Sequence, residues 1–354
     1  MILSDIYLWL SFSQVGTGKL NKLLGAIGPE KLWQSFGTDE GKYSLDEKTF
    51  AKLKRSHNIE FIERAKQYLQ INNIEYVTRA DPIFPEGLAQ SEVDPPLVLY
   101  YKGDINLVRE KCIAVVGTRK SSQYGKFATE KIVPELCENG MVIVSGLATG
   151  IDGYAHKAAL DCGGKTIAVL GSGLFNVTPV SNVGLFDKIC KCGLVISEYT
   201  PDTHASEYTF PQRNRIISGL SCGVLVIEAA DRSGSLITAG CALEQGRDVF
   251  AVPGDIDRIR SVGTNKLIKQ GATPVTCARD ILDSYGIAQS KDKKTPELDM
   301  FERKILDVLS EGETSFDSLV EKVGIIPSEL NTALSTLIIM GLIHEKSKNL
   351  YAVK

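Results

Sequence analysis

The sequence predicts an α/β protein built on an extended Rossmann-like, doubly wound and mostly parallel sheet. Between Cys112 and Pro253, six short apolar runs alternate with segments that favour helix, and almost every run ends in glycine or serine. Uninterrupted apolar runs are typical of strands buried on both faces by helices. The six runs are CIAVVG, MVIVSG, TIAVLG, GLVISEY, GVLVIEA and DVFAVPG.

Residues 1–80 lack strand alternation and favour a small helical domain. Residues 81–106 are rich in proline, and we expect an extended, loop-like connection because a residue before proline avoids the helical conformation. The turn VGTGKL at 15–20 has two interpretations. It is either a helix-hairpin-helix turn that offers backbone N–H groups to a DNA phosphate, or a connection inside a helical bundle, which we favour. The helices are expected at Asp5–Phe12, Gly18–Ile27, Glu30–Phe36, Asp46–Lys54 and Ile59–Asn72.

Residues 107–287 are expected to hold the sheet, 288–296 to form a polar linker, and 297–354 to form a winged helix-turn-helix domain. The third helix of this last domain carries one charged residue, Glu329. A helix that reads duplex DNA brings Arg, Lys, Asn or Gln to the base edges, so we expect this helix to pack against protein. The helices are expected at Leu298–Ser310, Phe316–Val323 and Pro327–Met340, followed by the hairpin LIHEKSKNLYAV.

The composition predicts a cytoplasmic protein without metal or cofactor. No apolar run approaches the roughly 20 residues that span a bilayer, and the acidic start lacks the basic segment of a signal peptide. The eight cysteines include no C-x-x-C pair and there are only four histidines, which disfavours a zinc site.

At 354 residues the chain is long for a single core, so we expect two or three domains.

Several strand ends carry residues that suit a phosphate. In parallel sheets ligands bind beyond the carboxyl ends of the strands, where helix N-termini present unpaired N–H groups. Glycine permits close backbone approach, hydroxyls donate, and arginine grips a phosphate with two parallel hydrogen bonds. We therefore predict a phosphate-binding site without catalytic residues. Its expected members are Gly117, Arg119, Lys120, Ser121, Gly146, Phe210, Arg213, Asn214, Arg215, Asn265 and Lys266.

Two further segments leave alternatives open. Asp152 and His156 lie four residues apart, and we favour a structural pair over acid–base chemistry because no nucleophile stands at a matching spacing. The segment 231–239 opens a helix with small hydroxyl residues, which serve either as caps or as phosphate donors. Residues 108–287 carry 19 basic and 18 acidic side chains, so any nucleic-acid site must be a local pocket.

A series of segments in the sheet region occurs together in a characteristic order: VGTRKSSQYG, SGLATGIDGYAHKAAL, TIAVLGSGL, SEY, FPQRNRIISGLS, SGSLITA, GRDVFAVPG and GTNKLIKQGA. This combination resembles one family, DNA processing protein A (DprA, also called Smf). The resemblance covers the whole sheet domain, and less specifically a SAM-like domain before it and a winged helix after it. Where the family has SGxARGID this chain has Thr149, which removes one positive contact.

The resemblance implies a homodimeric, non-enzymatic protein that binds and protects single-stranded DNA in natural transformation. It also implies RecA recombinase as a partner, which such proteins load onto the DNA. By motif position Arg119 is the phosphate-gripping residue, Arg213 and Arg215 line the same pocket, and Lys266 lies at its rim. The alternative is a nucleotide-processing enzyme of the lysine-decarboxylase-like (LOG) phosphoribohydrolase type, whose signature P-G-G-x-G-T-x-x-E supplies a catalytic glutamate. The corresponding stretch of this chain, DRSGSLITAGCALE, lacks the double glycine and the spacing of that signature. A scaffold without nucleic acid is a third reading, against which the arginines at the strand ends speak.

Overall fold

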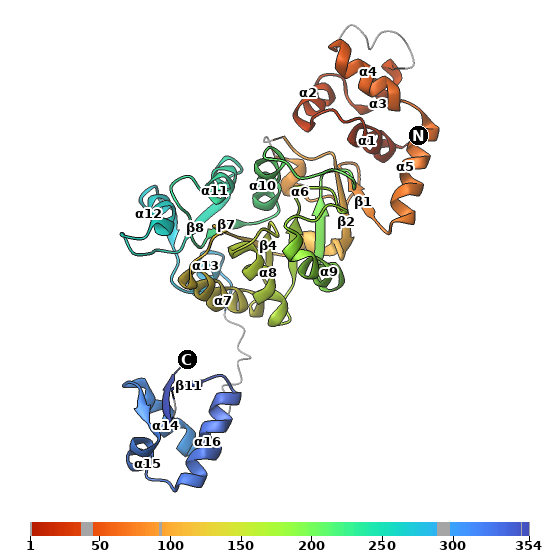
Figure 1. Cartoon of the computed structure of the whole chain (residues 1–354). Helices are drawn as coiled ribbons and strands as arrows, with labels where there is room; N and C mark the ends of the chain where they lie inside the picture. Colours follow the sequence, from red (N-terminus) through yellow and green to blue (C-terminus); the bar gives the residue numbers. More distant parts are fainter. Residues whose placement is uncertain (1, 37–44, 92–93, 289–297, 348, 354) are drawn as a thin grey trace. The chain divides into compact units, whose positions relative to one another are not determined.

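The structure, a computed structural model, describes residues 2–36, 45–91, 94–288, 298–347 and 349–353 (Figure 1). The chain divides into two compact units, Met1–Ala288 and Gln289–Lys354. None of the helices in the described ranges combines the length and the apolar composition of a membrane span. Residues 289–296 of the expected linker lie outside the described part of the chain.

A nine-stranded sheet forms the centre of the first unit, in the order β1-β2-β6-β5-β4-β3-β7-β8-β9. The seven strands from β6 to β9 in this order are parallel, and β2 and β1 continue the sheet as antiparallel strands. All six expected strands are present, as β3 to β8. The strands are β1 Glu75–Thr78, β2 Val98–Gly103, β3 Cys112–Val116, β4 Val142–Ser145, β5 Thr166–Val169, β6 Leu194–Ser197, β7 Gly223–Val226, β8 Asp248–Ala251 and β9 Thr273–Pro274.

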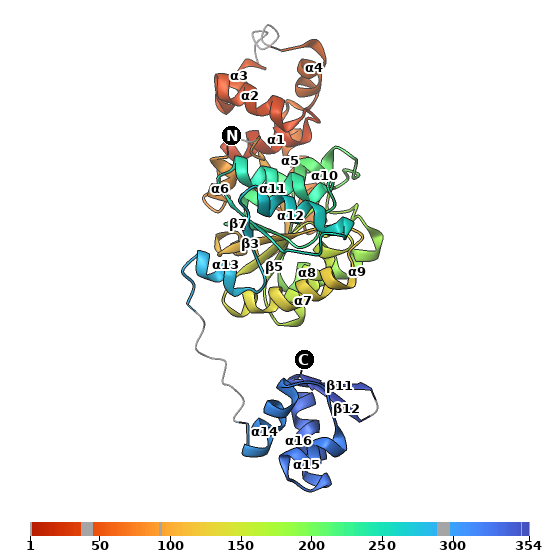
Figure 2. The ribbon, with the colours of Figure 1, turned by 90° about the vertical axis from the view of Figure 1, so that its left-hand side faces the viewer.

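Helices cover both faces of this sheet, as Figure 2 shows. Alternate side chains of a strand point to opposite faces. Ala114 and Val116 of β3 therefore pack in the cluster that includes α10 and α11, whereas Ile113 and Val115 pack against α7 and α8. Burial on both faces explains why the parallel strands are apolar throughout. The helices are α7 Gln123–Glu138, α8 Ile151–Asp161, α9 Val183–Cys192, α10 Thr209–Gly219, α11 Gly234–Glu244, α12 Val262–Lys269 and α13 Arg279–Ser284.

The proline-rich stretch 81–106 is not the loop that we expected, because it contains helix α6 (Glu86–Ala89) and strand β2. Val98 to Tyr101 are buried, and β2 pairs with β6 on one side and β1 on the other. The prolines stand before this strand, at Pro95 and Pro96, and do not interrupt its hydrogen bonds.

Among the residues that the structure describes, five short helices precede β1, close to the expected ranges. Their core centres on Trp9, whose ring lies 5.0 Å from that of Trp33, and it is continuous with the sheet through Tyr100. The hydroxyls of Ser11 and Tyr100 lie 2.6 Å apart. The turn at 15–20 leads into α2, where Thr17 Oγ1 lies 3.5 Å from Glu198 beyond β6. The helices are α1 Leu3–Phe12, α2 Thr17–Ile27, α3 Pro29–Ser35, α4 Glu47–Ser56 and α5 Ile59–Ile71.

Within its described residues, the second unit contains three helices and a small antiparallel sheet of order β10-β12-β11. Leu319, Leu330 and Leu337 are fully buried at its centre, and Tyr351 of β12 packs against them. The SAM-like and winged-helix assignments of the two flanking regions remain predictions. The elements are α14 Met300–Ser310, β10 Thr314–Ser315, α15 Phe316–Val323, α16 Pro327–Ile339, β11 Ile343–Ser347 and β12 Leu350–Val353.

Candidate nucleic-acid interface

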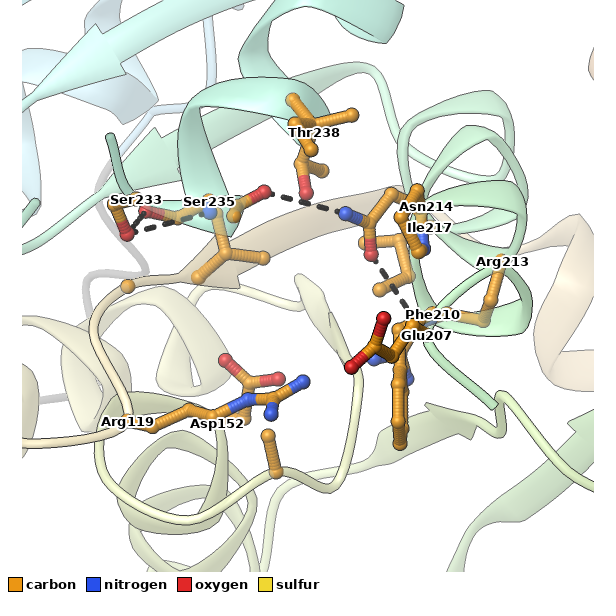
Figure 3. Close-up of a pocket in the computed structure, with 16 residues that line it drawn as sticks. Arg119, Asp152, Glu207, Phe210, Arg213, Asn214, Ile217, Ser233, Ser235 and Thr238 are labelled. Atoms are coloured by element: carbon orange, nitrogen blue, oxygen red, sulfur yellow. Dashed lines mark hydrogen bonds between the residues drawn. The ribbon is translucent and has the colours of Figure 1, made fainter. Parts of the chain in front are cut away.

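The order of the sheet reverses between β3 and β7. From β3 the chain continues to β4 on one side, and β7, which pairs with β3 on the other side, continues to β8. Loops after two such strands diverge and leave a crevice at their carboxyl ends, where open α/β sheets bind ligands. A pocket of about 500 Å³ lies there, which we call the switch-point pocket. Its walls come from the loops after β3, β4 and β7 and from α8, α10 and α11 (Figure 3).

Arg119 and Phe210 form one wall of this pocket. The guanidinium carbon of Arg119 lies 4.8 Å from the centroid of the Phe210 ring, which is within the range of a cation–π contact. Arg119 is exposed, and no ion pair to it occurs among the described residues. The ring therefore orients a charge that stays available to a ligand.

Arg213 lies deeper in the pocket and is only 3% exposed. Its Nη1 donates to the carbonyl of Gly146 at 2.6 Å and to that of Val169. Burial lowers the pKa of Arg213 to about 10, so it remains cationic at neutral pH, with neutral carbonyls as its partners. A Cβ at Gly146 would collide with this guanidinium, so a larger residue there would force the Arg213 side chain to move.

Asp152 and His156 do not bond each other, which corrects the expected pair. Asp152 Oδ2 accepts from the Gly146 N–H at 3.1 Å, and His156 Nε2 accepts from the Leu147 N–H at 3.3 Å. The other imidazole nitrogen lies 2.7 Å from Thr166 Oγ1. Burial raises the pKa of Asp152, whereas burial and the nearby charge of Arg213 lower the pKa of His156 to about 3. Both side chains are structural and hold the loop after β4.

The N-terminus of α11 faces the same pocket. Ser233 caps the helix by accepting from the Ser235 N–H at 3.4 Å, and both serines line the pocket together with Thr238. The sequence analysis gave two alternatives for segment 231–239, a helix cap or a phosphate donor. The structure shows a cap, and the helix end that it caps carries a partial positive charge. Glu207, which the sequence analysis missed, places an exposed carboxylate at the same pocket.

The predicted site residues separate into three groups. Gly117, Arg119, Phe210, Arg213 and Asn214 line the switch-point pocket, and Gly146 lies beneath Arg213. Lys120 and Ser121 line a neighbouring groove that shares Arg119 with the pocket. The third group lies elsewhere and contains Arg215, Asn265 and Lys266.

These last three residues have partners of their own. Arg215 forms an ion pair with Glu198 at 2.6 Å, with both side chains buried, which corrects the expectation that it lines the same pocket as Arg213. Asn265 bonds both backbone groups of Gly254, at 3.3 and 2.9 Å. Lys266 lies 3.1 Å from Asp231 on the surface.

Comparison with known proteins identifies the family. A family model described as DNA recombination-mediator protein A matches residues 75–286, which is more than half of the chain. The chain belongs to this family. Membership assigns the chain to DNA processing in recombination and transformation, and it does not favour the phosphoribohydrolase alternative.

Individual relatives extend the match. DNA processing protein DprA of Streptococcus pneumoniae is 49% identical over 58% of this chain and 72% of its own. Protein Smf of Synechocystis is 33% identical over 96% of both chains. The X-ray structure of the S. pneumoniae protein covers 80% of this chain and 98% of its own, with a TM-score of 0.69 and 37% identity. DNA processing protein A of Helicobacter pylori, a protein with a described single-stranded DNA binding mode, covers 60% of this chain and 95% of its own, with a TM-score of 0.54 and 31% identity.

Proposed function

We propose that this DprA-family chain is a non-enzymatic recombination mediator that binds single-stranded DNA in the switch-point pocket. The observation that carries the proposal is the contact of Arg119 with Phe210 at the topological switch point. An exposed guanidinium binds a backbone phosphate, and an aromatic ring beside it stacks on an unpaired base. The pocket thus offers both contacts that a flexible single strand needs.

The surroundings of this pair support an anionic ligand. Arg213 adds a second cation, and the N-terminus of α11 adds a partial positive charge. Asp152 and His156 bond the loop after β4, which supports a binding role for the pocket and disfavours acid–base catalysis.

The partners are part of the same proposal. We propose that the chain acts in the cytoplasm as a homodimer and hands its DNA to the RecA recombinase. Membership in the recombination-mediator family and the description of single-stranded DNA binding for the H. pylori protein support this assignment. Size-exclusion chromatography with light scattering tests the dimer, and RecA filament formation on strands coated with single-strand-binding protein tests the transfer.

Fluorescence anisotropy with a labelled oligothymidylate across a salt series tests the binding site. Arg119→Ala should weaken binding and lower the dependence of log affinity on log salt by about 0.7, the contribution of one phosphate contact in a single strand. Arg64→Ala is the control, because Arg64 is an exposed arginine on α5 that does not line the pocket. No binding by the wild type would refute the function, and an unchanged slope in Arg119→Ala would refute the site.

A further inference from the structure

A second hollow adjoins the switch-point pocket on the side of α8 and α9. It has a volume of about 670 Å³ and shares Arg119 with the first pocket. We call it the lysine groove and define it by Arg119, Lys120, Tyr154, Lys157, Asn182 and Lys188. Of these residues, the function proposed above uses only Arg119.

The groove concentrates uncompensated positive charge. Lys120, Lys157 and Lys188 are exposed, and among the described residues no ion pair or hydrogen bond involves their amino groups. Elsewhere in the same unit Lys66 pairs with Asp5 at 2.7 Å. Four basic side chains line the groove against one acidic side chain, Asp161. Positive charges gathered in a concave surface raise the local concentration of anions.

The backbone around the groove is held in place. Asn182 Nδ2 donates to the carbonyls of Leu147 and Ala148 at 2.9 and 3.1 Å, which fastens the segment before α9 to the loop after β4. Ala148 of this loop also lines the switch-point pocket. The two hollows therefore share a wall as well as Arg119.

We propose that the lysine groove is a second subsite for the same DNA strand, entered by way of Arg119. Its lysines contact successive phosphates, and Tyr154 provides a ring of the kind on which unpaired bases stack. Cations spread along a groove suit a polyanion better than a single phosphate, and lysine contacts to a backbone carry no sequence preference. This inference rests on the proposed function, since it extends the path of the strand bound there.

The test compares two labelled oligothymidylates, of about 4 and about 16 nucleotides. The short strand occupies the switch-point pocket alone, whereas the long strand reaches the groove. Lys157→Gln and Lys188→Gln should each weaken binding of the long strand about fivefold at 0.1 M salt and lower its salt slope by about 0.7. Binding of the short strand should stay unchanged. Lys269→Gln is the control, because Lys269 is an exposed lysine on α12 that lines neither hollow.

The outcomes separate this inference from the proposed function. If the wild type binds both strands and the two lysine variants match Lys269→Gln, the groove is not a DNA subsite. An equal loss for short and long strands would also overturn the inference. Lys157→Arg, which keeps the charge, should bind the long strand like the wild type. Failure of the wild type to bind either strand would instead refute the proposed function.

Discussion

Arg213 and Arg215 lie two residues apart on α10 and serve opposite sides of that helix. Successive helical residues are rotated by about 100°, so residues two apart point in nearly opposite directions. Arg213 reaches the switch-point pocket and donates to Gly146, whereas Arg215 pairs with the buried carboxylate of Glu198. One arginine therefore belongs to the site and the other to the core.

This division predicts that Arg215→Met lowers stability and leaves DNA affinity intact. Removing one partner leaves the other charge buried and unpaired, which costs about 3–5 kcal/mol of unfolding free energy. The double variant Arg215→Met with Glu198→Met should recover most of that loss, because no charge then remains buried. Urea denaturation measures both effects. A single variant as stable as the wild type would contradict the structural role of the pair.

Phe210 should contribute stacking energy to DNA binding. Phe210→Leu keeps an apolar side chain but removes the aromatic face and the contact with Arg119. We expect it to weaken oligothymidylate binding by about 1–3 kcal/mol, the range for one stacked base. Anisotropy titration checks this value, with Phe210→Tyr as the variant that retains the ring. Equal affinities for the leucine and tyrosine variants would argue against stacking.

Glu207 should oppose binding, because its exposed carboxylate lines the pocket that we propose for the DNA phosphates. Glu207→Gln is expected to strengthen single-strand binding by about 0.2–1 kcal/mol, the range for an exposed charge pair. The gain should shrink as salt rises, since the screening length is about 10 Å at 0.1 M. Glu244→Gln, an exposed carboxylate on α11 outside the pocket, is the control. If Glu207→Gln bound the strand more weakly than the wild type, the Glu207 side chain would support the DNA contact.

The lowered pKa of His156 predicts that the protein loses stability in acid. Its folded-state pKa is lowered to about 3 from 6.5, so between these values the unfolded chain binds the extra proton. The free energy of unfolding should therefore be highest above pH 6.5 and fall as the pH drops, by about 2 kcal/mol per site near pH 5. Urea denaturation against pH measures the slope. His156→Gln should flatten it, whereas the exposed His204→Gln should leave it unchanged.

The fold could be predicted where burial leaves a signature in the sequence. Strands β3 to β8 are covered on both faces and therefore appear as apolar runs. Strands β1 and β2 were missed because β1 has four residues, two of them not buried, and β2 follows two prolines. Strand β2 pairs with β6, far along the chain, and residue periodicity carries no information about such a partner.

The site was predictable only in part for a related reason. Glycines and arginines at strand ends pointed to Arg119, Arg213 and Gly117, but the order of strands decides which loops meet. Lys266 follows β8 and lies away from the pocket because β8 is one strand further from the reversal. Glu207 belongs to the irregular segment before α10, where no repeating pattern distinguishes a pocket residue from a surface one.

The antiparallel pair β1 and β2 has a practical consequence for dissecting the molecule. A fragment that begins at residue 107 would lack both strands. Strand β6 would then be an exposed edge strand, open to pairing with other molecules. The truncation would also remove Tyr100 from the apolar cluster that includes Ala168 and Val195 of the sheet. An expression fragment that starts ahead of Glu75 and ends after Gly286 should keep β6 paired with β2. We expect this longer fragment to give the higher soluble yield of the two.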